Sequence, residues 1–226
     1  MSTSTRSAVD SVGMWSAAGV SGLFLAFGAL LLIDFWRPTS LLSFAVCLAA
    51  APLFVAMMAS IYEHAAPTRR IWGLLGLAFA VVYAVLVGIT YYLQLTVVGA
   101  DGTGLSAEAA RLLAFAPGSA TFAIDMLGYA FMTLATLSAA PVFAGLGLER
   151  VIRRWFVVHG LLFVPTVLAP LMMPAASGEP DQIGNLILIG WTLVFVPMAV
   201  LVALHFRRRL QGVAAVAPAA LRPSPS

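Results

Sequence analysis

The sequence predicts an all-α fold, a polytopic membrane protein built as a bundle of six transmembrane helices. Six long apolar stretches follow one another along the chain, and each has about the 20 residues that a helix needs to cross a hydrocarbon core. Hydrophobic residues make up 62% of the 226 residues and charged residues only 9%, far below the roughly 25% charged fraction of soluble domains. The arginines fall almost entirely in every second connection. Together these observations exclude an ordinary soluble domain.

The predicted spans take up most of the chain and leave no room for a second domain. The longest connection, Thr96–Ser119, is far shorter than a soluble domain. We therefore expect a single membrane domain over residues 1–226, with residues 1–12 and 207–226 as short cytoplasmic tails. The expected spans are Gly13–Ile33, Leu41–Tyr62, Ile71–Leu95, Ala120–Leu148, Trp155–Met173 and Ile183–Phe206.

Two local features refine this picture. A short extracytoplasmic helix is expected at Leu105–Phe115, between spans three and four, because Ser106 is a good N-cap residue. Pro52 and Pro141 each follow an Ala-Ala pair inside a predicted span, and proline removes one backbone hydrogen bond from a helix. We therefore expect both prolines to bend their helices at equivalent depths.

The distribution of arginine predicts how the chain crosses the membrane. All but two of the twelve arginines, Arg37 and Arg111, lie on one side of the six-span topology, and arginine-rich loops stay in the cytoplasm. Both termini are therefore expected to be cytoplasmic. The chain contains no lysine and much Ala, Gly and Pro, which is typical of GC-rich bacteria and predicts the bacterial cytoplasmic (inner) membrane. The net charge of +3 indicates contact with anionic lipid headgroups and not with nucleic acid.

Asp125 points most directly to a function. It lies about one turn inside the fourth expected span, where a charge costs about 2.5–3.5 kcal/mol on insertion scales. Tyr129, Thr133 and Thr136 follow at helical spacing, so the polar face is expected to point into the bundle. Polar residues of the third and sixth spans fall at a similar depth. The candidate ligand-binding residues are Asp125, Tyr129, Tyr91, Gln94 and Asn185.

Two interpretations of Asp125 are open at this stage. In the functional one, its carboxyl lines an outward-facing polar pocket and binds a cationic or hydrogen-bonding ligand, or exchanges a proton. In the structural one, it ties the third, fourth and sixth spans together through hydrogen bonds to Tyr91, Gln94 or Asn185. The two differ in what the carboxyl contributes, namely a ligand contact or stability.

The three histidines form a candidate metal site. His64, His159 and His205 all fall near the cytoplasmic face, with Glu63 or Glu149 as a further ligand, and imidazole and carboxylate groups bind Zn²⁺. Short His-to-His spacings typical of metal sites are absent. The alternative is that His64 and His205 are interfacial and that His159 bonds to a neighbouring helix. No phosphate-binding loop or nucleophile elbow is present, so we predict no catalytic residue and no cofactor.

Two segments carry a resemblance to a known group of proteins. Ile124–Arg154, with Asp-Met-Leu-Gly-Tyr, Ala-Ala-Pro-Val-Phe and Leu-Glu-Arg, and the segment Tyr91-Tyr92-Leu-Gln-Leu resemble an uncharacterised family of bacterial multi-spanning, six-helix membrane proteins. The resemblance covers spans three to five. It implies a bacterial six-helix membrane protein with a carboxylate at the position of Asp125, and it implies no activity.

These observations lead to one leading function and two alternatives. The leading hypothesis is binding or transport of a small molecule or lipid through the pocket around Asp125. The first alternative is a non-catalytic membrane scaffold or regulator of a partner protein. The second, less favoured, is a membrane enzyme built on the histidines. Membrane lipids are expected partners in each case, and the sequence leaves homo-oligomerisation open.

The predicted topology is testable with reporter fusions. Alkaline phosphatase folds only outside the cytoplasm, so fusions after residues 100 and 178 are expected to be active and fusions after residues 67 and 215 inactive. The reverse pattern contradicts cytoplasmic termini.

Overall fold

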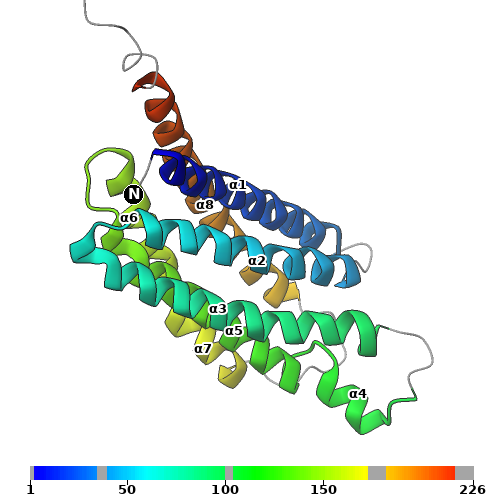
Figure 1. Cartoon of the computed structure of the whole chain (residues 1–226). Coiled ribbons are helices and arrows are strands. Elements are labelled where there is room, and N and C mark those ends of the chain that lie inside the picture. The colour runs from blue at the N-terminus through cyan, green and yellow to red at the C-terminus, as the bar shows by residue number, and fades with distance from the viewer. Residues whose placement is uncertain (1–2, 35–39, 100–103, 173–181, 217–226) are drawn as a thin grey trace, which may run out of the picture.

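A computed structural model describes residues 3–34, 40–99, 104–172 and 182–216. All regular secondary structure within these ranges is helical, and six segments are long and apolar enough to cross a membrane. The predicted fold class, an all-α six-span bundle, is therefore confirmed. Figure 1 shows the helices side by side in an elongated bundle, with the start of α1 and the end of α8 at the same end.

The elements follow the chain in the order that the apolar stretches predict. Short turns of 3-10 or π type, labelled η, adjoin α3 and α5. The elements are α1 (Thr3–Asp34), α2 (Ser40–His64), η1 (Pro67–Arg69), α3 (Arg70–Leu93), η2 (Gln94–Val98), α4 (Ala107–Leu113), α5 (Ala120–Ala139), η3 (Ala140–Val142), α6 (Leu148–Leu161), α7 (Phe163–Met172) and α8 (Gln182–Val216).

The fourth span ends earlier than expected. α5 and η3 stop at Val142, whereas the expected span ran to Leu148. Pro141 has no N–H to continue the helical hydrogen bonds, and Gly147 turns the chain with φ 61°, a conformation that suits glycine. The expectation that Pro141 bends a continuous span is wrong, because the helix ends there. Pro52 lies inside the uninterrupted α2.

The fifth span begins earlier than expected, at Leu148 in place of Trp155, so the arginines of this region lie on the first turns of α6. α6 ends at Leu161 and α7 begins at Phe163. Pro165 accounts for this break, since it cannot donate a hydrogen bond to the carbonyl of Leu161.

The connections and tails also have helical parts. The short helix expected between spans three and four is α4, and the N–H of Ala109 donates to its N-cap, Ser106 Oγ, at 3.2 Å. The segments expected as tails are helical next to the bundle, because α1 begins at Thr3 and α8 continues to Val216.

The six spans close into a ring. α1 packs against α2 and α8, α3 packs against α2 and α5, and α6 packs against α5 and α8. α5 is the most enclosed span. Of the residues in its apolar stretch, 61% are buried, compared with 22–39% in the other spans. The polar residues of α5 therefore lie in the most buried of the six spans.

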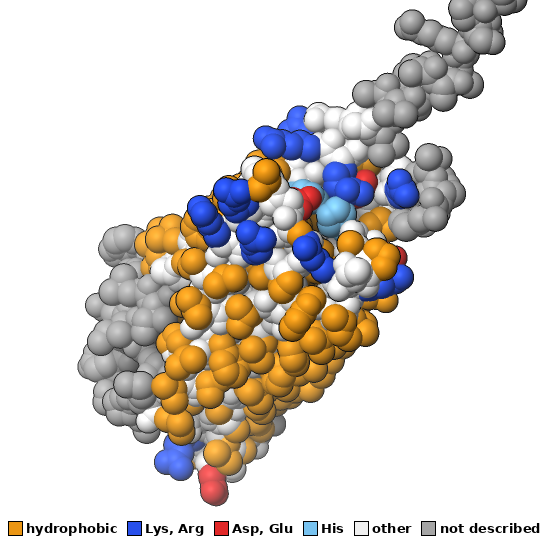
Figure 2. Space-filling view, turned by 90° about the vertical axis from the view of Figure 1, so that its left-hand side faces the viewer, with side chains coloured by type: hydrophobic (Ala, Val, Ile, Leu, Met, Phe, Trp, Pro, Cys, Tyr) orange, Lys and Arg blue, Asp and Glu red, His pale blue; other side chains and the backbone are white. Residues whose placement is uncertain are grey.

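The surface is divided into an apolar belt and a charged end. Figure 2 shows hydrophobic side chains over the middle of one face and a group of basic side chains, here arginines, gathered at one end. We call this the arginine-rich end. It holds the starts of α1, α3 and α6 and the ends of α2 and α8, and the other end is called the opposite end.

Each span contributes a ring-bearing side chain to the centre of the bundle. Trp191 on α8 lies 5.1 Å from Tyr129 on α5, 5.2 Å from Phe24 on α1 and 5.2 Å from His159 on α6, measured between ring centroids. We call this group the ring layer. Its members are Phe24, Phe54, Tyr83, Tyr129, His159, Trp191 and Phe195.

The close contact of α3 with α5 depends on Gly76. A Cβ at this position would lie 2.9 Å from the carbonyl oxygen of Ala135, whereas a Cβ on Gly88 of the same helix would meet nothing within 4 Å. We expect Gly76→Ala to lower the free energy of unfolding by about 1–3 kcal/mol and Gly88→Ala to leave it unchanged. Thermal unfolding of the detergent-solubilised protein measures both. Equal melting temperatures contradict the packing.

Candidate functional site

Two groups of polar side chains lie inside the bundle at different depths. The first surrounds Asp125 and is called the carboxyl cluster; it also contains Tyr91, Tyr129 and Cys47. The second, the histidine cluster, joins His64, Glu149 and His205 at the arginine-rich end, where His64 borders the same hollow as Arg6 and Arg209. The ring layer lies between them in the fold.

α5 carries Asp125 into the interior. Ser119 caps the helix by accepting a hydrogen bond from the N–H of Phe122 at 3.1 Å, so Asp125 falls in the second turn and faces inward. Its side chain is 1% exposed. Its Oδ1 atom has no hydrogen-bond partner among the described residues. Burying a carboxyl oxygen without a hydrogen-bond partner costs free energy. Such a group in a native protein is therefore expected to have a structural or functional role.

Hydrogen bonds connect the carboxyl cluster across three helices. The Tyr91 hydroxyl on α3 donates to the Tyr129 hydroxyl at 3.0 Å, and Tyr129 donates to Cys47 Sγ on α2 at 3.8 Å. Asp125 lies one helical turn before Tyr129 on the same face of α5, and both side chains are buried. The structure therefore brings together three of the predicted site residues, Asp125, Tyr91 and Tyr129.

Aromatic side chains cover the carboxyl cluster on the side of the opposite end. Phe44 stacks on Tyr91 with ring centroids 5.7 Å apart, and Phe115 lies 5.2 Å from Phe44 and 5.8 Å from Phe122. We call these three phenylalanines the aromatic cover. The expected outward-facing pocket is thus closed over Asp125 in this structure.

Gln94, another predicted site residue, makes a separate contact. Gln94 Nε2 donates to the carbonyl of Leu113 at 2.7 Å, and Thr121 Oγ1 donates to the same carbonyl at 3.0 Å. Gln94 therefore fastens the segment that carries Phe115. Asn185 belongs to α8, and its side chain lies outside the described residues.

The polar face of α5 continues from Asp125 to the ring layer. Thr133 Oγ1 donates to the carbonyl of Ala130 at 2.7 Å, and Thr136 Oγ1 lies 2.8 Å from Nδ1 of His159. At 1.5 Å per residue, this face covers about 16 Å, roughly half of a hydrocarbon core. It therefore reaches from the carboxyl cluster to α6.

The histidines divide into a pair and an isolated residue. His64 Nε2 and His205 Nε2 lie 3.2 Å apart, and the carboxylate of Glu149 completes a group whose ligand atoms all lie within 4.8 Å of one another. His159 is not part of this group, which corrects the expected set of three. Because α6 begins at Leu148, His159 lies about 15 Å farther along the helix than Glu149.

Two members of the interior carried no recognised signal in the sequence. Cys47 is 1% exposed, but in the sequence it was one of many residues in an apolar span. Trp191, 8% exposed, lies in the middle of the bundle, whereas tryptophans of membrane proteins favour the interfaces. Its position inside a predicted span, away from the expected interfaces, was the signal that could have identified it as an interior residue.

The fold and the buried polar interior define a polytopic, all-α membrane protein with a buried aspartate side chain in its core. Comparisons with protein-family models, with curated proteins and with solved structures returned no match. The function therefore has to be argued from the geometry.

The burial of Cys47 predicts its reactivity. In the folded, detergent-solubilised protein, the thiol is expected to resist maleimide labelling and to react fully after denaturation in SDS, because it is 1% exposed. A Cys47→Ser, Leu146→Cys variant is the control, since Leu146 is 76% exposed and its replacement is expected to label in the folded state. Rapid labelling of native Cys47 contradicts the packing around Tyr129.

Proposed function

We propose that this protein binds or transports a small cationic molecule, or a lipid with a cationic headgroup, in its interior at Asp125. The observation that carries the proposal is the Asp125 carboxyl, which is 1% exposed at membrane depth with Oδ1 unpartnered among the described residues. Ionisable side chains within a membrane span are rare and mark substrate and ion pathways in many membrane proteins.

The surroundings of Asp125 favour a cation over other ligands. The ion pairs found among the described residues are Arg70 with Glu63 and Arg209 with Asp10, so within this part of the chain no arginine pairs with Asp125. Tyr91, Tyr129 and the aromatic cover lie in the same region, and aromatic rings attract a positive charge. An ammonium group would bind to the carboxylate and against these rings.

Further polar atoms of the interior add support. Several buried polar atoms have no hydrogen-bond partner among the described residues; three of them belong to the ring layer and two to Thr90 and Asp125 on α3 and α5. Each such group costs about 1–3 kcal/mol if it remains unpaired. A ligand with hydrogen-bonding groups would pair them. These atoms are Asp125 Oδ1, Thr90 Oγ1, Tyr83 Oη, Trp191 Nε1 and His159 Nε2.

Access from the opposite end would require movement of the aromatic cover. Phe115 is attached to a short segment that Gln94 and Thr121 hold by hydrogen bonds to Leu113. This segment has fewer packing partners than the spans, so it is the natural part to move. We also propose that the opposite end faces the exterior of a bacterial cell, with both termini in the cytoplasm, since the arginines gather at the other end.

Binding can be tested on the purified full-length chain by thermal unfolding with a panel of ammonium compounds, including choline, methylammonium, spermidine and ethidium. We expect at least one compound to raise the melting temperature of the wild type saturably, since a ligand at about 100 times its Kd adds about 2.7 kcal/mol to stability. Asp125→Asn is expected to remain folded and to lose the response.

Glu108→Gln is the matched control, because it removes an exposed acidic charge at the opposite end, and it should keep the full response. The proposal fails if no compound stabilises the wild type, or if Asp125→Asn responds as the wild type does. A lower melting temperature of Asp125→Asn without any ligand response of the wild type supports the structural interpretation, in which the carboxyl only holds helices together.

A further inference from the structure

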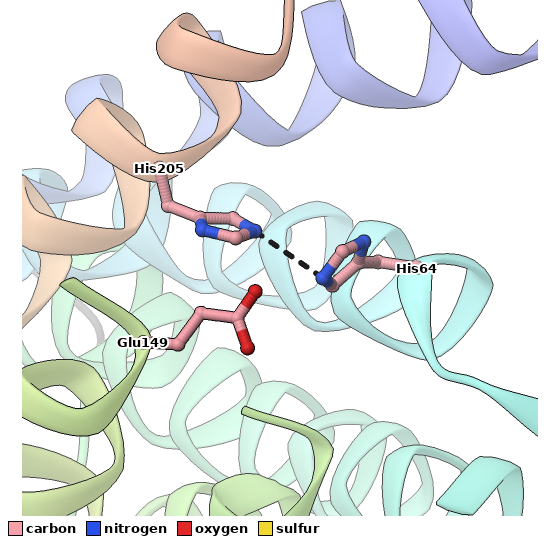
Figure 3. A group of neighbouring side chains, drawn as sticks. All are labelled: His64, Glu149 and His205. Atoms are coloured by element: carbon pink, nitrogen blue, oxygen red, sulfur yellow. Dashed lines mark hydrogen bonds between the residues drawn. The ribbon is translucent and has the colours of Figure 1, made fainter. Parts of the chain in front are cut away.

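We propose that His64, His205 and Glu149 form a binding site for a divalent transition-metal ion of the zinc class at the arginine-rich end. The three residues come from three different spans, α2, α8 and α6, and are brought together only by the fold. Figure 3 shows the Glu149 carboxylate pointing toward the gap between the two imidazoles. The site shares no residue with the carboxyl cluster.

The two histidines have the separation of metal ligands. Zinc binds imidazole nitrogen at about 2.0–2.1 Å in tetrahedral geometry, which places two nitrogens about 3.3 Å apart. The observed Nε2-to-Nε2 distance is 3.2 Å. The ring centroids are 4.8 Å apart. This is closer than they would be if the two imidazoles pointed straight at each other across the same 3.2 Å. The rings therefore converge at an angle, as they do around a shared ion.

Glu149 supplies the third donor and is already oriented by the backbone. The N–H of Gly145 donates to its Oε2 at 2.6 Å, which leaves Oε1 for a metal. Carboxylates that bind metals are commonly held in this way by a neighbouring donor. The present spread of up to 4.8 Å among the ligand atoms closes to the tetrahedral distance of about 3.3 Å with side-chain movements that total about 1.5 Å.

The donor set indicates the class of metal. Two imidazoles and one carboxylate suit Zn²⁺ and neighbouring ions such as Co²⁺, and three protein ligands leave one position open for water or a further ligand. Oxygen-rich sites suit Mg²⁺ and Ca²⁺ instead. We therefore choose Zn²⁺ and Co²⁺ as the probes.

A hollow at the arginine-rich end gives access to the site. It has a volume of about 240 Å³ and is bordered by His64 and Glu63 together with residues of α1 and α8. Asp10, on its wall, accepts a hydrogen bond from Arg209 Nε through Oδ1 at 2.9 Å, while its buried Oδ2 has no partner among the described residues. Asp10 thus keeps one free carboxylate oxygen beside His64, although its charge is paired with Arg209 and Arg6 also borders the hollow.

Two phenylalanines form an apolar side of the site. Phe143 lies 5.6 Å from His205 and 6.3 Å from His64 between ring centroids, and Phe206 lies 5.9 Å from His64. Such a shell limits competition by water and strengthens the binding of an ion to its ligands. A bound ion would link α2, α6 and α8 and stabilise the fold.

The test uses the full-length protein in detergent, without a polyhistidine tag, washed with EDTA and freed of it. Zn²⁺ binding is measured by competition with a chromophoric chelator, and Co²⁺ binding by its visible absorption. We expect one ion per chain, a rise in melting temperature with Zn²⁺, and the intense absorption of tetrahedral Co²⁺. His64→Gln and His205→Gln are each expected to weaken binding more than about 100-fold, beyond the 10–100-fold effect of an outer-shell partner.

His159→Gln is the matched control, since this histidine contacts Thr136 and lies outside the cluster; it should bind one ion with unchanged affinity. Glu149→Gln should weaken binding by at least about 10-fold and alter the Co²⁺ spectrum. The absence of saturable binding to the wild type, or equal affinity in His64→Gln and His205→Gln, would show that the pair is only a hydrogen bond and would overturn the proposal. The wild-type result decides the matter even if a histidine variant fails to fold.

Discussion

The structure depends on one constraint: hydrocarbon offers no hydrogen bonds, so polar side chains in a membrane have to face each other inside the protein. Among the described residues, the most enclosed helix, α5, accordingly carries more buried polar residues than any other span, and the spans around it present large apolar side chains outward. The ring layer meets the same constraint with amphipathic groups. Its tyrosines, tryptophan and histidine combine an apolar body with a polar atom, so they fill the centre while continuing the polar path from Asp125.

The break after α5 determines what lies at the arginine-rich end. Because Pro141 ends the helix, Phe143 leaves it with φ −84° and ψ 89° and becomes fully buried against the histidines. The short connection then starts α6 at Leu148, which sets Glu149 in its first turn beside His64 and His205. An uninterrupted fourth span would have carried this carboxylate away from both histidines. Pro141 was expected to bend a helix. It ends the helix instead, and this break brings the histidine cluster together.

The spans could be predicted from the sequence because they follow from length and apolarity alone, and the inward position of Asp125 follows from the cost of exposing a carboxyl to lipid. The partners of these residues could not. Gln94 and Tyr91 are close in sequence and lie on one helical stretch, yet Tyr91 joins the carboxyl cluster and Gln94 binds the backbone of Leu113. Likewise, His159 was expected near the other histidines because the start of its helix was placed at Trp155. The helix in fact begins seven residues earlier, at Leu148. At about 1.5 Å per residue, this difference places His159 in the ring layer, away from the other histidines.

α6 connects the two polar clusters mechanically. It carries Glu149 at one end and His159 at the other, and His159 contacts both Thr136 on the polar face of α5 and Trp191 in the ring layer. Any rigid displacement of α6 that rearranges the ring layer therefore also moves Glu149 relative to His64 and His205. Coupling between two binding equilibria is reciprocal. An ion that held Glu149 in place would oppose a ligand that displaced α6, whereas a ligand that moved only the aromatic cover would be indifferent to the ion.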